Sequence, residues 1–319
     1  MPMKNLEQLG PFFPGSRIGF LLLHGLAGTP AEMKIVGKRL NRLGFTVLCP
    51  LLAGHCASEE ELIATNWTDW AQSAANAFDQ LAEQTDAVFV GGLSAGAVLS
   101  LYLAQRRPNK VRGLALYSIT LRYDGWTIPK LRFLLPLLLR LPYIGKRYRF
   151  EEAFPYGIMN DALRNRILTQ MRSGNAAAAG FTATPGVSVR ELLGLVAAVK
   201  KDLPKVTTPS LLIHAKNDDI AGVQNNALYV QKQVNGPSEL LLLDNSYHMI
   251  TVDQERDKVC EATARFAANL LNTEEIQSLR ENAAEVTPPF GPHGGMEFAD
   301  MDNFSPAEGN DARSAGPVC

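Results

Sequence analysis

Short runs of apolar residues, each about as long as a β-strand, recur along the chain between polar segments. Each run is bounded by Gly, Pro or Asp, and runs of about four to eight apolar residues are typical of parallel strands covered on both faces. We therefore predict strands at Ile18–Leu23, Phe45–Cys49, Ala87–Gly91, Val111–Tyr117, Ser210–His214 and Glu239–Leu243.

Segments with helical periodicity lie between these runs. Thr29 is the expected N-cap of the first such segment. Strand alternating with helix predicts a mostly parallel, doubly wound α/β sheet, and a mixture of unrelated helices and strands is the alternative. The predicted helices are Pro30–Leu43, Thr68–Ala82, Ala95–Gln105, Gln224–Gln233 and Val252–Leu271.

The alternation breaks between residues 121 and 205, where the pattern predicts helices and turns but no strand. This segment lies between two late strands, and open α/β sheets bind ligands outside the carboxyl ends of their strands. We therefore expect a helical cap at 121–205 over the ligand site, inserted into a core made of residues 1–120 and 206–273. From Glu285 onward the chain is polar and rich in Gly and Pro, and we expect residues 274–319 to form a disordered tail.

Composition and charge narrow the class of function. The 319 residues include 31 Lys and Arg against 32 Asp and Glu, and this balance argues against a nucleic-acid partner, because nucleic-acid binders usually carry a basic excess. The most apolar stretch, residues 128–144, is broken by charges and Pro and falls short of the roughly 20 apolar residues of a spanning helix. The four cysteines lack metal-site spacing and suit a reducing compartment. No continuous apolar stretch follows the lysine near the N-terminus, so we expect no secretory signal. We expect a cytoplasmic protein without a metal.

Gly92-Leu93-Ser94-Ala95-Gly96 follows one predicted strand and opens the next helix. The G-x-S-x-G pattern in this context is typical of a nucleophile elbow, in which the glycines allow a strained turn that exposes the serine hydroxyl. The helix N-terminus then brings amide donors to the reacting centre. The alternative is a serine that only caps a tight strand-to-helix turn.

A serine hydroxyl needs an adjacent base, and the position of the histidines selects His248. His248 follows the last predicted strand, at the sheet edge from which a loop can reach back to Ser94. A histidine in an ordinary surface loop is the alternative. His214 ends a strand and is expected to be structural, and His293 falls in the tail.

His24 begins a loop, His24-Gly25-Leu26-Ala27-Gly28, after the first apolar strand. This position suits an oxyanion loop, in which the amide of Leu26 joins the amide of Ala95 in binding a developing negative charge. His55 lies in another loop, where it either braces the chain or contacts substrate.

The acid that orients the base is expected after the strand that ends at His214. Asp218 and Asp219 both follow it, and Asp244 is a weaker third candidate. We select Asp218 over Asp219, because adjacent acids usually include one solvated partner. The order Ser94, Asp218, His248 is the order of catalytic residues in α/β-hydrolases.

The sequence resembles the α/β-hydrolases, and among them the bacterial carboxylesterase and monoacylglycerol lipase group. The similarity runs from Phe20 to about Asn272 outside the cap, and the motifs that carry it are HGLAGTP, LLAGHCASEEEL, WTDW, GLSAGA, HAKNDD and NSYHMITVDQERDKV. Two positions depart from the group: Cys56 stands where relatives usually have Gly, and Ala221-Gly222 stand near where many carry Pro.

The resemblance implies an α/β-hydrolase fold with a cap and a serine esterase that needs no cofactor. It implies Ser94 as nucleophile, His248 as base and Asp218 as acid, with the oxyanion bound by the amides of Leu26 and Ala95. The partner is then a small-molecule ester with an acyl chain. A thioesterase, an acyltransferase and a non-catalytic binding scaffold are the alternatives.

The cap bears on the substrate. Its basic residues flank apolar ones and could line an acyl tunnel, rest on an anionic lipid surface as a peripheral membrane contact, or simply pack on the protein's own domain. The candidate substrate-binding residues are His55, Trp126, Phe133 and Leu137.

Overall fold

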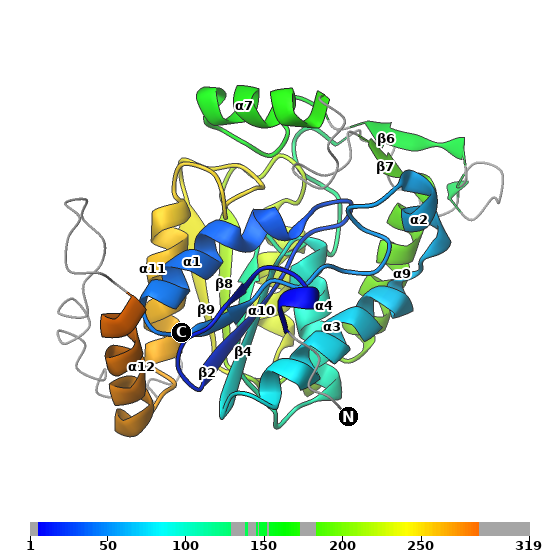
Figure 1. The fold of residues 1–319 in the computed structure, drawn as a ribbon. Helices are drawn as coiled ribbons and strands as arrows, with labels where there is room; N and C mark the ends of the chain where they lie inside the picture. Colours follow the sequence, from blue (N-terminus) through cyan, green and yellow to red (C-terminus); the bar gives the residue numbers. More distant parts are fainter. Residues whose placement is uncertain are drawn as a thin grey trace, which may run out of the picture.

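A computed structural model describes residues 6–128, 138–139, 145, 147–151, 153–172 and 183–286. Its centre is a seven-stranded sheet in the order β1-β3-β2-β4-β5-β8-β9, in which β1 pairs antiparallel with β3 and every other pair is parallel (Figure 1). The strands are β1 (Phe12–Phe13), β2 (Ile18–Leu23), β3 (Thr46–Leu48), β4 (Ala87–Leu93), β5 (Val111–Tyr117), β8 (Ser210–Ala215) and β9 (Ser238–Leu243). The predicted doubly wound sheet is confirmed.

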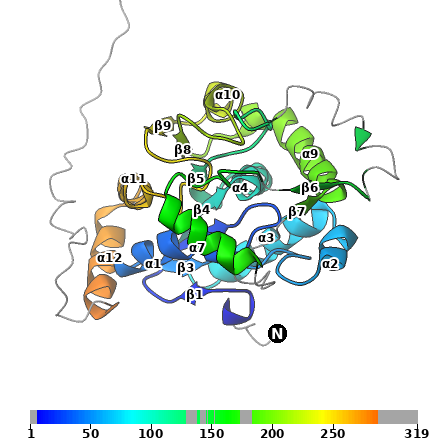
Figure 2. The same ribbon diagram turned by 90° about the horizontal axis from the view of Figure 1, so that it is seen from above.

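Helices cover both faces of this sheet, which explains why β2 and β4 are apolar throughout. In β2, Leu21 packs into the core on one face and its neighbours Phe20 and Leu22 pack into the core on the other. A strand turns successive side chains to opposite faces, so a strand buried on both sides favours apolar residues at successive positions. Figure 2 shows the two helical layers from above.

One layer contains α3 (Trp67–Ala82), α4 (Ala95–Arg106), α9 (Gly186–Lys201) and α10 (Ala227–Gln233), with the short α2 (Glu59–Ala64) at its edge. The opposite layer contains α1 (Lys34–Arg42), α11 (Arg256–Ala268) and α12 (Thr273–Val286). Short 3-10 helices lie at Leu6–Gln8, Pro30–Met33, Leu203–Lys205 and Val223–Asn225.

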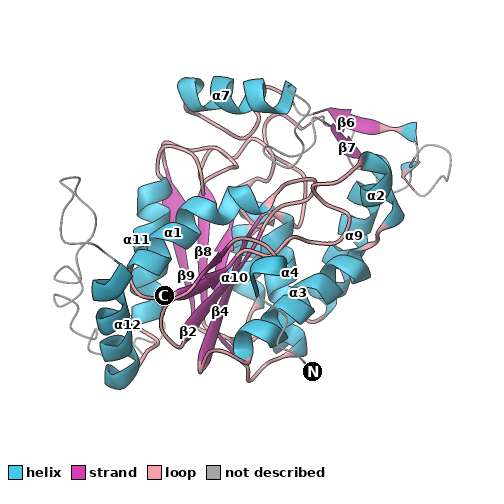
Figure 3. Ribbon diagram, viewed as in Figure 1, coloured by secondary structure: helices cyan, strands magenta, loops and turns pink. Residues whose placement is uncertain are grey.

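The insertion between β5 and β8 lies over the carboxyl edge of the sheet, as expected for a cap. Its described part holds α7 (Asp161–Arg172) and a small antiparallel pair, β6 (Arg149–Glu151) with β7 (Ala183–Pro185) (Figure 3). The expectation of no strand in this segment was therefore wrong, because these runs are too short to carry a periodic signal.

The cap boundary also differs from the predicted 121–205. Helix α9 packs in the same core cluster as α4, and Gln105 of α4 donates a hydrogen bond to the Val199 carbonyl at 2.9 Å. Leu192 and Leu195 are buried there. Helix α9 is thus a crossover helix of the core, and the cap ends before it.

The predicted disorder from residue 274 was wrong for residues 274–286, which form α12. A capping box starts the helix: Asn272 accepts from the Glu275 amide at 2.9 Å, and Glu275 accepts from the Asn272 amide at 2.8 Å. Leu279 packs in the core cluster of this layer, and Ala283, one helical turn later, is also buried. Residues 287–319 lie outside the described part of the chain.

Helix α11 starts later than the predicted Val252, at Arg256. The preceding residues turn instead of joining the helix, and the carboxylate of Asp253 accepts the amide of Gln254 at 2.9 Å. This turn aims acidic side chains back at the loop before it. Within the described residues, no helix combines the length and the apolar character needed to span a membrane.

Candidate active site

The turn between β4 and α4 has the geometry of a nucleophile elbow. Ser94 adopts φ 57° and ψ −112°, and its amide donates to the Tyr117 carbonyl at 2.9 Å. A Cβ on Gly92 would lie 2.4 Å from the Gly96 carbonyl carbon, and one on Gly96 would lie 2.2 Å from the Leu23 carbonyl oxygen. Both glycines are therefore required sterically, because the helix starts directly over the sheet.

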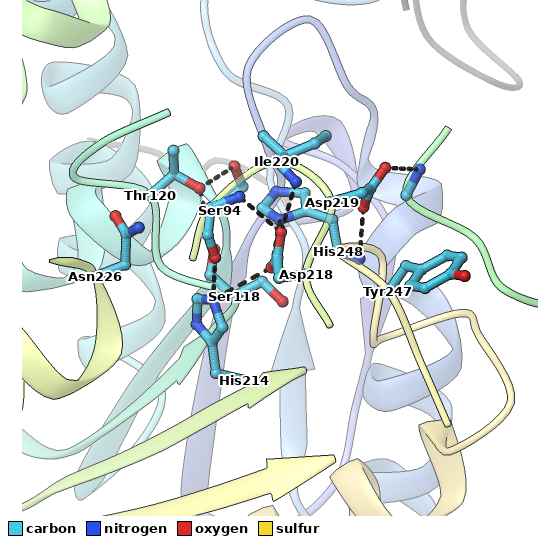
Figure 4. A network of polar contacts seen from close by, with 12 residues as sticks. Ser94, Ser118, Thr120, His214, Asp218, Asp219, Ile220, Asn226, Tyr247 and His248 are labelled. Carbon is cyan, nitrogen blue, oxygen red and sulfur yellow. Dashed lines mark hydrogen bonds and ion pairs between the residues drawn. The ribbon is translucent and has the colours of Figure 1, made fainter. Parts of the chain in front are cut away.

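The hydroxyl of Ser94 lies 3.1 Å from Thr120 Oγ1, which in turn donates to the Ser118 carbonyl at 3.2 Å. Because Thr120 uses its proton on that carbonyl, it accepts the proton of Ser94. The serine hydroxyl is thus turned toward Thr120 in this conformation (Figure 4).

Loops after β8 and β9 bring an acid and a base together. His248 Nδ1 lies 2.8 Å from Asp218 Oδ2. The amides of Ile220 and Ala221 donate to Asp218 Oδ1 at 2.9 and 2.7 Å, which fixes the carboxylate. His214 Nε2 lies 3.2 Å from Asp218 Oδ2 and 2.6 Å from the Ala221 carbonyl, so this nitrogen carries a proton. Figure 4 shows Asp218 between the two imidazole rings.

Asp218 and His248 shift each other's pKa values. Burial by itself disfavours a charged carboxylate, but the facing His248 and the hydrogen bonds from both histidines hold the pKa of Asp218 below its ordinary value. Burial by itself lowers the pKa of a histidine, but the Asp218 carboxylate outweighs it and raises the pKa of His248. The pair is therefore arranged to stabilise an imidazolium.

The other two acids considered in the sequence lie elsewhere. Asp219 accepts the backbone amide of His248 at 3.2 Å and that of Gly157 at 3.0 Å, so it contacts the main chain of His248 rather than its ring. Burial raises the pKa of Asp219, although the nearby His248 opposes the shift. Asp244 is exposed and pairs with Lys216 at 2.6 Å.

The loop that carries Leu26 is held by a half-buried carboxyl group, that of Glu32, which was not among the candidate site residues. Glu32 accepts the Gly25 amide at 2.8 Å and the Thr29 amide at 3.3 Å. A Cβ on Gly28 would lie 1.8 Å from Glu32 Oε1, so the loop closes tightly over this side chain. Burial raises the pKa of Glu32 to about 7. The capping-box spacing of Thr29 and Glu32 was the signal that could have revealed it.

His24 links the loop that carries Leu26 to the segment that contains Leu52. Its Nδ1 donates to the Gly25 carbonyl at 2.9 Å, and its Nε2 accepts the Leu52 amide at 3.3 Å. Burial lowers its pKa to about 3, so the ring is neutral. Ala95 is the first residue of α4, and its amide has no intrahelical acceptor.

The substrate-binding candidates are scattered. His55 is 3% exposed, lies between the rings of His24 and Trp70, and donates from Nδ1 to the Ala53 carbonyl at 3.0 Å. Burial lowers the pKa of His55 to about 4, so this ring is also neutral. Its geometry favours loop bracing over substrate contact.

Trp126 is 58% exposed and packs edge-on against Tyr247. Phe133, Leu137 and most of the basic and apolar cap residues lie outside the described part of the chain, so the acyl tunnel and the membrane contact stay predictions. Cys56 adopts φ 62°, a left-handed conformation that Gly adopts most readily. The turn is therefore kept although Cys56 stands where relatives usually have Gly.

Known proteins share this architecture. Residues 16–255 match the family described as serine aminopeptidase, S33 (Hydrolase_4). The chain is 26% identical over 264 residues to a thermostable monoacylglycerol lipase of Bacillus sp. (strain H-257), covering 82% of this chain and 96% of that protein. It is 24% identical over 262 residues to a carboxylesterase of Bacillus subtilis (strain 168), with coverage of 82% and 96%.

Solved structures agree with these matches. A metagenome-derived lipolytic enzyme superposes with a TM-score of 0.69 at 26% identity, over 81% of this chain and 96% of that chain. The resemblance predicted from the sequence motifs is confirmed. Because the match spans more than half of its residues, the chain belongs to the serine aminopeptidase S33 family and has the α/β-hydrolase fold.

Proposed function

We propose that this chain, an ester hydrolase by its relatives, cleaves carboxylic esters of small molecules through a Ser-His-Asp triad and an acyl-enzyme intermediate. Ser94 is the nucleophile, His248 the base and Asp218 the acid. The observation that carries the proposal is the 2.8 Å contact between His248 Nδ1 and Asp218, at the sheet edge where Ser94 stands on a strained elbow.

Asp218 sets the tautomer of the base. Because Nδ1 of His248 donates to this carboxylate, Nε2 carries no proton in the neutral ring and is free to accept one. The raised pKa of His248 supports the same role, since the carboxylate stabilises the imidazolium that forms during the reaction. A second donor, His214, keeps the carboxylate turned toward His248.

Acylation starts when the Ser94 hydroxyl turns from Thr120 toward His248. Its proton passes to Nε2 as its oxygen attacks the ester carbonyl, and the amides of Leu26 and Ala95 bind the oxyanion. When the carbonyl re-forms, the bond to the leaving alcohol breaks, and His248 returns the proton to that alcohol. The product is an ester between Ser94 and the acyl group.

Deacylation repeats the same steps with water. His248 removes a proton from water, the resulting hydroxide attacks the acyl-enzyme, and the proton returns to Ser94 as the acid leaves. The named activities of the relatives, a monoacylglycerol lipase and a carboxylesterase, support an ester with an acyl chain as the substrate.

The test is hydrolysis of p-nitrophenyl esters of graded acyl length, together with monoacylglycerols, a thioester and an amino-acid amide. A competing alcohol in the same assays separates hydrolysis from acyl transfer. Ser94→Ala should lower ester turnover by on the order of 10⁴-fold or more with little change in melting temperature. The control, Ser278→Ala on the distant helix α12, should keep full activity.

Labelling with a fluorophosphonate provides an independent readout. The wild type should form an adduct at Ser94, and Ser94→Ala should form none. A folded wild type that forms no adduct and turns over no acyl substrate would favour a binding scaffold instead.

A further inference from the structure

Residues 244–250 form the loop that carries His248, which we call the histidine loop. Most of its central backbone amides donate hydrogen bonds to acceptors outside the loop. The amide of Tyr247 donates to Asp253 at 3.1 Å, that of His248 to Asp219 at 3.2 Å, and that of Met249 to the Gly157 carbonyl at 2.8 Å. A loop with so many external partners has a backbone position that is set by those partners.

Asp253 is completely buried, and its two oxygens accept four backbone amides. Oδ2 accepts Met159 at 2.7 Å and Tyr247 at 3.1 Å, and Oδ1 accepts Asn160 at 3.1 Å and Gln254 at 2.9 Å. Only a carboxylate supplies two acceptors here, because an asparagine would turn an NH₂ group against two N–H donors. Asp253 thus joins the histidine loop to residues of the cap insertion.

Asp219 makes a second bridge of the same kind. One oxygen accepts the amide of His248, and the other accepts the amide of Gly157. The same short cap segment, Gly157–Asn160, is therefore bound by both carboxylates; we call it the cap strap. The strap belongs to the insertion between β5 and β8, and the histidine loop follows β9.

The strap also packs directly on the base. Gly157 has φ +70°, and a Cβ there would lie 3.2 Å from His248 Cβ and 2.9 Å from Met249 Cγ. Its carbonyl accepts the Met249 amide, so the contact is both steric and polar. The left-handed backbone conformation and the closeness of the histidine favour a glycine at this point.

We propose that the cap strap is a positioning element for His248, with Asp219 and Asp253 as the positioning residues that fasten it to the histidine loop. The inference rests on the proposed role of His248 as base. The cap then does more than cover the site: a displacement of the strap moves the imidazole relative to Asp218 and Ser94.

The first test is Asp253→Asn in the full chain, with Asp257→Asn as the matched control. Asp257 lies in the first turn of α11, where its exposed carboxylate pairs with Arg39 at 2.6 Å. Asp253→Asn should lower kcat for p-nitrophenyl acetate by about ten- to a hundredfold, since small misplacement of a catalytic group has effects of this size, with KM little changed. The control should match the wild type.

The pH profile separates positioning from general loss of stability. A misplaced His248 loses part of its contact with Asp218, which holds its pKa up, so the acid limb of kcat/KM should move to lower pH. A merely structural role would lower the amount of active enzyme without moving that limb.

Gly157→Ala is the second variant, because it keeps both carboxylates and pushes the strap off His248. It should reproduce the lower kcat and the shifted limb, and it decides the question if Asp253→Asn does not fold. Folded variants with the wild-type kcat and pH profile would overturn the proposal.

A ¹H NMR titration of His248 reads its pKa without any substrate. If the wild type hydrolyses no ester, the proposed function fails, and the titration still decides this inference. An unchanged His248 pKa in both variants would overturn it, and a lowered pKa would support it.

Discussion

The two sides of the proposed catalytic centre are built from the chain in different ways. On the nucleophile side, a single stretch, Gly92–Gly96, supplies the strand end, the strained serine and the helix start. Its conformation follows from steric contact, since side chains at the two glycines would collide with backbone. On the base side, the amide of Met159 and the carboxylate of Asp253 that binds it are separated by 94 residues in sequence.

This difference determines how each side responds to change. The elbow is packed against backbone that cannot move, so substitutions there strain the fold itself. The histidine loop is held by buried carboxylates, each of which serves several amides at once. We therefore expect substitutions of the two elbow glycines to affect stability and activity together, and substitutions of the groups that hold the histidine loop to affect mainly activity.

The largest effect should come from Gly96→Ala. The added Cβ would lie 2.2 Å from the Leu23 carbonyl oxygen and 2.6 Å from that of His24. We expect the free energy of unfolding to fall by about 3 kcal/mol or more and ester turnover to be lost. Urea unfolding and p-nitrophenyl acetate assays measure both quantities.

Gly194→Ala is the control for this variant, because its Cβ would meet only the Trp67 side chain; its stability should stay within about 1 kcal/mol of the wild type. A Gly96→Ala protein with wild-type stability would contradict the conclusion that steric contact sets the conformation of the elbow.

Asp218→Asn should lower kcat by about 10⁴-fold while the protein stays folded, because an amide at this position favours the wrong tautomer of His248. Asp219→Asn should cost about tenfold, since Asp219 holds the backbone of His248 and not its ring. Steady-state kinetics compare the two variants directly. If Asp219→Asn proved the more damaging, the acid would have to be reassigned by one residue.

The raised pKa of Glu32 predicts that the free energy of unfolding depends on pH through a group on the nucleophile side. Its pKa is raised from 4.5 to about 7, so its stabilising contribution is fully present below about pH 4.5 and is lost as the pH rises through about 7. The free energy of unfolding of the wild type relative to Glu32→Gln should fall by on the order of 3 kcal/mol between pH 4.5 and 8. Chemical denaturation across this range measures it, and a constant difference between the two proteins would refute it.

The smallest effect should come from Thr120→Val. The substitution removes the acceptor that holds the Ser94 hydroxyl while keeping the shape of the side chain. The loss of one competing hydrogen bond should raise kcat/KM by up to about threefold. Thr169→Val, on the exposed face of α7, is the control. A tenfold fall would instead make Thr120 part of the catalytic machinery.

Much of the fold could be predicted because the sheet is buried on both faces. The strands Ile18–Leu23 and Val111–Tyr117 have the predicted bounds, since a polar residue follows each apolar run, His24 in the first case and Ser118 in the second. Helix α12 was missed because the alternation that predicted the sheet stops before it, and only its capping box and two buried residues mark it.

The sequence by itself determined the six central parallel strands and most of the helices between them, the elbow at Ser94 and the candidate positions for the acid, because these depend on periodicity and on contacts between near neighbours. Only the tertiary structure decided which acid faces the imidazole of His248, that Glu32 supports the loop of Leu26, and that the cap strap contacts the base. The reason is physical: a carboxylate binds whichever amides the fold brings within about 3 Å. Those amides come from residues far apart in the sequence, so no local sequence pattern predicts the contact.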